Sequence, residues 1–101
     1  MFWHYPGYFA AGILAANSVP HFVHGISGRR FITPFASPPF VGESSPLVNV
    51  LWGLVNFVGA FSLVTGLGDF HPGFTLDTLW LFSGAALTAV GLAVYFPRVR
   101  K

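Results

Sequence analysis

Long apolar runs separated by short polar or proline-rich stretches set the pattern of this chain. Three of these runs are long enough for an α-helix to cross a bilayer, which takes about 20 residues. They lie at residues 6–27, 46–67 and 74–96. The composition agrees, because 53% of the residues are hydrophobic and 8% are charged, against about 25% charged in soluble domains. We therefore predict an all-α protein in which residues 1–101 form a single membrane domain, an integral bundle of three transmembrane helices.

Local signals place the ends of these helices. Ser45 and Pro46 are typical of an N-cap followed by the first helical position, and they predict where the second helix begins. Gly66 and Gly68 predict its end, since glycine is common just beyond a helix C-terminus. Pro97 predicts the end of the third helix at residue 96. The connection at residues 28–45 is rich in proline and is predicted to form no regular helix.

The basic residues mark one side of the membrane. All five follow the first or the third apolar segment, and none lies between the second and third: Arg29, Arg30, Arg98, Arg100 and Lys101. The positive-inside rule then predicts an N-terminus outside and a C-terminus in the cytoplasm. The loop 28–45 is expected at the cytoplasmic interface, folded back over the helix ends. So few basic residues, placed at helix ends, predict no nucleic-acid partner.

Polar residues inside apolar segments are the candidate functional positions, because they are costly in lipid. Helical spacing puts those of the first segment on one face and those of the second on another. We predict one intramembrane cluster, in the cytoplasmic half of the bilayer, built from Asn17, His21, His24, Asn49, Asn56 and Thr88. Because the first two helices are antiparallel, depth predicts specific neighbours. The expected neighbours are Asn17 with Asn56, His24 with Asn49, and His21 with Gly53.

Three roles are open for this cluster: hydrogen bonding between helices, a ligand site, or a path for protons or ions. The chain has no cysteine, and the only acid near the cluster is Glu43, so we predict no metal site. His21 and His24 are the candidate cofactor residues. A haem or another pigment needs only one axial imidazole, and Gly53 beside His21 would leave room for the ring. A quinone is a further candidate, although no cofactor at all is the leading expectation.

Other residues on the outer side and on the third segment have plainer expected roles. His4, His71, Asp69 and Asp77 are expected to decorate the outer turns, although a shared site is possible there. Small residues form a face on the third segment that permits close helix packing. These residues are Gly84, Thr88 and Gly91, with Ala85, Ala89 and Ala93 beside them.

Two polar motifs carry a resemblance. Residues 17–25 read Asn-x-x-Pro-His-Phe-x-x-Gly and residues 49–56 read Asn-x-x-Trp-Gly-x-x-Asn. In these motifs the chain resembles a group of small bacterial polytopic membrane proteins, over roughly residues 10–60. That group has no assigned activity. The resemblance therefore implies a multi-pass protein of the bacterial inner (plasma) membrane and no chemistry.

The chain shows no nucleophile–base pair, phosphate-binding loop or paired carboxylates, so we predict that it is not an enzyme. The leading hypothesis is a small structural or accessory membrane subunit, surrounded by the lipid bilayer, that packs with copies of itself or with a larger membrane complex. The first alternative is an electron-transfer membrane protein that binds haem, a pigment or a quinone at His21 and His24. The second alternative is a minimal oligomeric transporter.

Overall fold

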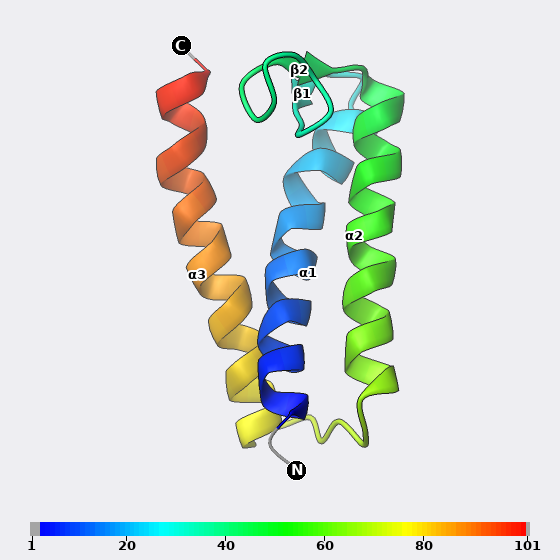
Figure 1. Cartoon of the computed structure of the whole chain (residues 1–101), viewed down its shortest axis with the longest axis vertical. Coiled ribbons are helices and arrows are strands. Elements are labelled where there is room, and N and C mark those ends of the chain that lie inside the picture. The colour runs from blue at the N-terminus through cyan, green and yellow to red at the C-terminus, as the bar shows by residue number, and fades with distance from the viewer. Residues whose placement is uncertain (1–2, 101) are drawn as a thin grey trace.

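The structure is a computed structural model that describes residues 3–100, and it consists of three long helices (Figure 1). Helix α1 spans His4–Ile26, α2 spans Pro46–Gly66 and α3 spans Leu76–Val99. Two short strands, β1 (Phe31–Ile32) and β2 (Glu43–Ser44), lie in the connection between α1 and α2. The predicted all-helical architecture is confirmed. Lys101, one of the five basic residues used to predict orientation, lies outside the described residues.

Helix α1 is the central element of the fold. Helices α2 and α3 both pack along α1, and no comparable packing joins α2 to α3 within the part of the chain that the structure describes. Figure 1 shows α3 close to α1 near the N-terminus of the chain and diverging from it towards the C-terminus. The three helices therefore form an open row rather than a closed bundle.

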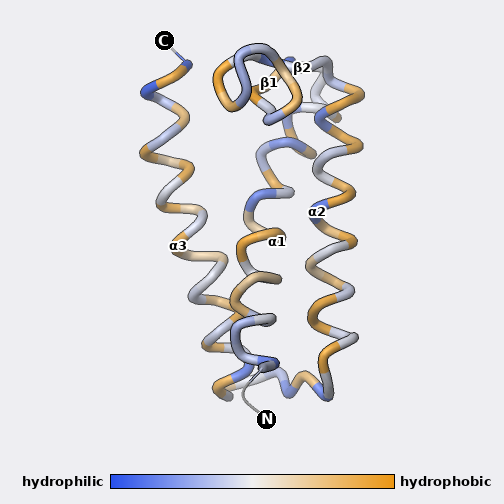
Figure 2. The backbone as a smooth tube through the Cα atoms, viewed as in Figure 1, coloured by the Kyte–Doolittle hydropathy of each residue, from blue (hydrophilic) through white to orange (hydrophobic). Residues whose placement is uncertain are grey.

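Two of the three helices, α2 and α3, are long and apolar enough to cross a membrane. Helix α1 has 23 residues but is not in this group. The physical reason is its content of polar side chains, which Figure 2 shows as hydrophilic stretches within the α1 tube. Because α1 lies between the other two helices, these polar groups can face protein.

The helix ends follow the capping signals in part. The hydroxyl of Ser45 accepts a hydrogen bond from the backbone N–H of Val48 at 3.2 Å, as expected for the start of α2. The predicted end of α3 at residue 96 is wrong, because the helix continues through Pro97 to Val99. A proline in the last turn removes only one backbone hydrogen bond, and the rest of the turn persists.

Glycines set the distance between the helices. A β-carbon on Gly84 would lie 2.0 Å from the carbonyl oxygen of Phe9, and one on Gly12 would lie 2.1 Å from that of Leu81. The backbones of α1 and α3 therefore touch at this crossing. The expected small-residue face does not extend further along α3, since Gly91 has open space around its α-carbon. The divergence of α3 after Gly84 explains this difference.

The connection between α1 and α2 folds back over the helix ends at the C-terminal side (Figure 1). Its strands pair antiparallel, with Phe31 opposite Ser44, a feature that the sequence reading did not predict. The Tyr95 hydroxyl of α3 donates to the carbonyl oxygen of Phe40 at 2.5 Å. The loop is thereby attached to α3 as well as to the two helices that it connects.

Candidate functional site

A ladder of polar side chains joins α1 to α2. The Asn17 amide donates to the side-chain oxygen of Asn56 at 3.1 Å, which is the pair that depth predicted. The Asn56 amide in turn donates to the backbone carbonyl of Trp52, one turn earlier in α2, at 2.8 Å. The hydrogen bonds of these two asparagine side chains are therefore made within the protein.

Asn49 is the most heavily bonded residue of the ladder. Its side chain is fully buried, at 0% exposed, and the amide nitrogen donates towards three backbone carbonyls at 3.0–3.2 Å. These carbonyls belong to Phe31, Ser44 and Ser45. The remaining oxygen lies 2.9 Å from Nδ1 of His21. Because that oxygen can only accept, the hydrogen of this contact belongs to His21 Nδ1.

One of the other expected pairs, His24 with Asn49, differs in the structure. Asn49 meets His21 and not His24, which is a correction of about one helical turn. His24 instead stacks on the Phe31 ring, with ring centroids 4.1 Å apart, and its Nδ1 accepts from Arg29. Thr88 was expected to belong to the cluster, yet within residues 3–100 its hydroxyl makes no hydrogen bond with the other members. The cause is that His21 faces α2 and the loop, away from α3.

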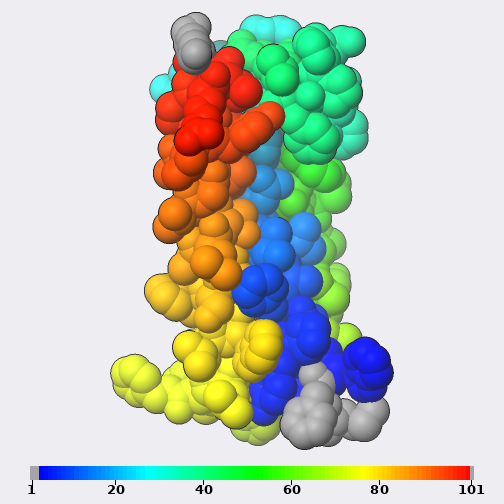
Figure 3. All heavy atoms as spheres, turned by 60° about the vertical axis from the view of Figure 1, so that its left-hand side comes forward, coloured from blue at the N-terminus to red at the C-terminus, as the bar shows by residue number. Residues whose placement is uncertain are grey.

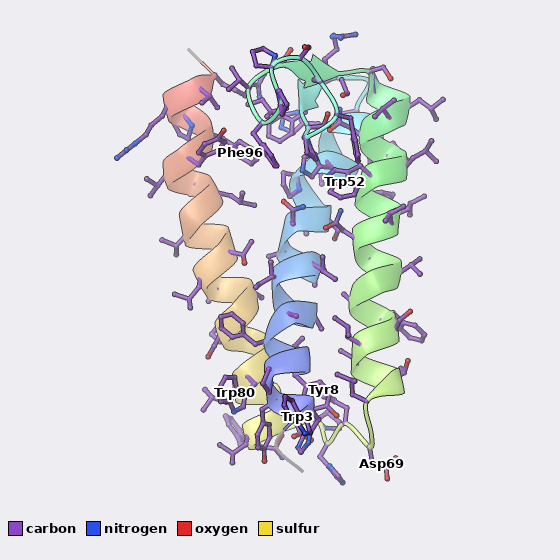
Figure 4. The ribbon with its side chains drawn as sticks, in the orientation of Figure 1. Trp3, Tyr8, Trp52, Asp69, Trp80 and Phe96 are labelled. Carbon is purple, nitrogen blue, oxygen red and sulfur yellow. The ribbon has the colours of Figure 1, made fainter. Side chains whose placement is uncertain are left out.

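The packing around His21 bears on cofactor binding. Gly53 was expected to leave space there, but a β-carbon on it would lie 2.9 Å from the backbone nitrogen of Phe22. The α1 backbone therefore fills that space. Phe31 and Trp52 border the His21 ring as well, and Figure 4 shows Trp52 pointing from α2 towards α1. Among the described residues, Trp52 Nε1 is the one buried side-chain nitrogen or oxygen without a hydrogen-bond partner.

A groove of about 1290 Å³ lies between α1 and α3, where the helices diverge. Small and aliphatic side chains line most of it, including Ala16 of α1 and Ala85, Ala89 and Ala93 of α3. Figure 3 shows this side of the molecule, with the loop against the C-terminal end of α3. The groove therefore runs along the helices and ends beneath the loop.

Polar groups gather at the loop end of this groove. His24, Arg30, Glu43 and Arg100 all line it. Arg100 Nε lies 3.4 Å from a carboxylate oxygen of Glu43, and its guanidinium lies 5.1 Å from the centroid of the Phe31 ring. The groove is thus apolar along its length and charged at one end.

A second polar cluster lies at the opposite end of the molecule. The Asp77 carboxylate accepts from the backbone N–H of His71 at 2.9 Å, and the His71 ring nitrogen lies 3.3 Å from the same oxygen. His4 of α1 approaches the other oxygen at 3.9 Å. These residues were expected to decorate the turn, whereas the structure brings three of them together. Within residues 3–100, no group of three such side chains has the arrangement of a metal site.

The sequence pattern did not predict a site at the charged end of the groove. Arg30 and Arg100 were interpreted only as orientation signals, and Glu43 only as an isolated acid. Phe31 and Phe96, with ring centroids 4.7 Å apart, bring the loop against α3; Figure 4 shows Phe96 directed from α3 towards the loop. The unusual number of phenylalanines in the proline-rich loop was the available signal that it packs on protein.

No protein-family model matches the chain, and comparisons with curated proteins and with solved structures find no match either.

Proposed function

We propose that this chain is a small structural or accessory subunit of the bacterial inner membrane, a three-span protein that packs with copies of itself or with a larger membrane complex. The main observation behind this proposal is the open row of helices, in which α2 and α3 each pack against α1 through one face only. Their other faces expose large apolar side chains, among them Phe57 and Phe61 of α2 and Leu87 and Val90 of α3. Lipid and partner helices are the surroundings that suit such surfaces.

The bonding of the polar ladder supports a structural role for its residues. Asn17, Asn49, Asn56 and His21 bond to one another or to backbone carbonyls. A catalytic or transport site needs polar groups that are free to meet a substrate. We therefore assign the ladder to holding α1 against α2, and we assign His21 to packing rather than to cofactor ligation.

The proposed topology has the N-terminus outside and the loop and C-terminus in the cytoplasm. Because the chain has no cysteine, single cysteines introduced at Gly73 and Ser37 report their own sides without background. Membrane-impermeant thiol labelling of intact cells should modify the cysteine at Gly73 and spare the one at Ser37 until the cells are opened. Labelling of Gly73→Cys only after opening would overturn this topology.

The proposed assembly is tested by mass. The full chain, extracted in a mild detergent, should migrate in a native separation as an oligomer or with co-purifying membrane proteins. Cross-linking through a cysteine at Phe61, on the exposed face of α2, should capture the same contact in cells. A monomer that forms no cross-link at Phe61, nor at Leu87 on α3, would contradict a subunit role.

A further inference from the structure

We propose that the groove between α1 and α3 binds an anionic phospholipid, with an acyl chain along the alanines and the phosphate at the end lined by Arg30 and Arg100. This inference rests on the membrane insertion proposed above. It assigns a ligand to a surface that the subunit role leaves open.

The apolar part of the groove has the dimensions of an acyl chain. From Phe82 to Phe96 its α3 wall rises about 20 Å, at about 1.5 Å per residue. One leaflet contributes about half of the ~30 Å hydrocarbon core, so a single chain fits within this length. The methyl side chains of Ala85, Ala89 and Ala93 leave the groove open along α3, and Ala16 does the same on α1.

Arg30 and Arg100 provide hydrogen-bond donors at the loop end of the groove. Arg30 Nη2 donates one hydrogen bond to the backbone carbonyl oxygen of Glu43, and Arg100 Nε is paired with the Glu43 carboxylate. A guanidinium has five N–H donors, so most of the donors on both arginines remain for a phosphate. Two guanidinium charges also outweigh the one carboxylate. Anionic headgroups are therefore favoured over zwitterionic ones.

His24 adds a donor to the same end. Its Nδ1 accepts a hydrogen bond from Arg29 Nε at 3.2 Å, so Nδ1 has a lone pair and Nε2 carries the ring hydrogen. The stacking of His24 on Phe31 fixes the plane of the ring at the groove wall. A phosphate oxygen could accept from this N–H together with the arginines.

The shape of the groove favours a lipid over a helix from another chain. The loop closes one end, since Val41, Gly42 and Glu43 line the groove and Tyr95 bonds the loop to α3. A transmembrane helix of ~10 Å diameter would have to continue past this end to reach the aqueous phase. A phospholipid ends there instead, at its headgroup.

The test is native mass spectrometry of the full chain in detergent with added phosphatidylglycerol or phosphatidylcholine of identical acyl chains. Phosphatidylglycerol should bind at least about tenfold more tightly, a difference that corresponds to ~1.4 kcal/mol. The double variant Arg30→Gln with Arg100→Gln should lose this preference. Arg98→Gln is the matched control, because Arg98 is exposed on α3 and does not line the groove. Equal loss in the control, or no headgroup preference in the wild type, would overturn the proposal.

A second pair of variants tests the acyl wall without touching charge. Ala89→Leu with Ala93→Leu should narrow the groove and weaken binding of both lipids, whereas Val90→Leu, on the exposed side of α3, should not. Unchanged binding in the alanine variants would place the lipid elsewhere. Displacement of lipid by a second copy of the chain would show as a dimer without bound lipid, which would also overturn the assignment. Failure of the membrane proposal is seen separately, in the thiol-labelling experiment.

Discussion

His21 Nδ1 and Asn49 Oδ1 lie 2.9 Å apart, and this contact connects the polar interior of α1 to the first turn of α2. The Asn49 amide reaches the carbonyls of Phe31 and Ser44 from the same position, so one side chain holds a helix, a neighbouring helix and the loop. Both partners are nearly fully buried, at 3% exposed for His21 and 0% for Asn49. An unpaired polar group in such a place is costly.

Replacement of Asn49 should therefore be the most damaging change in the polar ladder. Asn49→Leu leaves the buried His21 Nδ1 without its partner and removes the side-chain hydrogen bonds to the loop carbonyls, at an expected cost of about 1–3 kcal/mol. The measurement is thermal unfolding of the purified chain in detergent, compared with Asn56→Leu as a milder case. A smaller destabilisation for Asn49→Leu than for Asn56→Leu would contradict this ranking.

His21 separates a packing role from ligation. His21→Gln retains a side-chain N–H that can reach the oxygen of Asn49, so most of the stability should remain, whereas His21→Leu should lose about as much as one unmet buried hydrogen bond, ~1–3 kcal/mol. Absorbance spectra of the wild type and of both variants accompany the melts. A visible chromophore that disappears in His21→Gln, with the fold intact, would refute the packing assignment.

Asn17 and Asn56 should behave as a coupled pair. Their hydrogen bond, 3.1 Å long, is expected to contribute around the 0.6 kcal/mol average of interhelical bonds in membranes. Asn17→Leu leaves the side-chain oxygen of Asn56 without its donor, and Asn56→Leu leaves the Asn17 amide without its acceptor, while the double change replaces two polar groups by two apolar ones. A double-mutant cycle should thus show the double variant more stable than the sum of the single losses. Strict additivity would argue against direct coupling.

The pairs show how far depth along an antiparallel helix predicts contact. Register placed Asn17 beside Asn56 because both lie near the middle of their helices, α1 and α2. Nearer the loop, the same comparison of depths predicted the wrong partner for Asn49. It predicted His24, whereas Asn49 contacts His21, about one turn earlier in α1. Depth carries no information on helix rotation or on the course of the loop. In the structure, β1 brings Phe31 between His24 and α3.

The helices were predictable from their length and capping residues, whereas the groove was not. Ser45, Pro46 and Gly66 mark α2 locally, so its ends could be read from neighbouring residues. The groove depends on the angle at which α3 leaves the crossing at Gly84, and no local signal encodes that angle. Arg30 and Arg100 are distant in sequence, and only this divergence, with the loop folded over it, brings them to one place.

The Asp77 cluster should hold the turn between α2 and α3 to the start of α3. Asp77→Ala removes the acceptor for the backbone N–H and the ring of His71, so the thermal midpoint should fall. Asp77→Asn keeps one acceptor oxygen and should fall less. Asp69→Ala is the control, since Asp69 lies in the same connection between α2 and α3 but is exposed, and it should change stability by no more than about 0.5 kcal/mol. If the Asp69 and Asp77 variants melt alike, the carboxylate does not anchor the turn.

Two glycines of α3 give opposite predictions for one and the same substitution. Gly84→Ala would place a β-carbon 2.0 Å from the Phe9 carbonyl oxygen, so α1 and α3 must separate, at a cost of roughly 1–3 kcal/mol for overpacking. Gly91→Ala meets nothing within 4 Å, and the higher helix propensity of alanine should stabilise α3 by up to about 1 kcal/mol. Thermal unfolding of both variants should therefore move in opposite directions from the wild type. A Gly84→Ala variant as stable as Gly91→Ala would mean that the two helices do not touch at this crossing, and the groove that opens beyond it would lose its geometric basis.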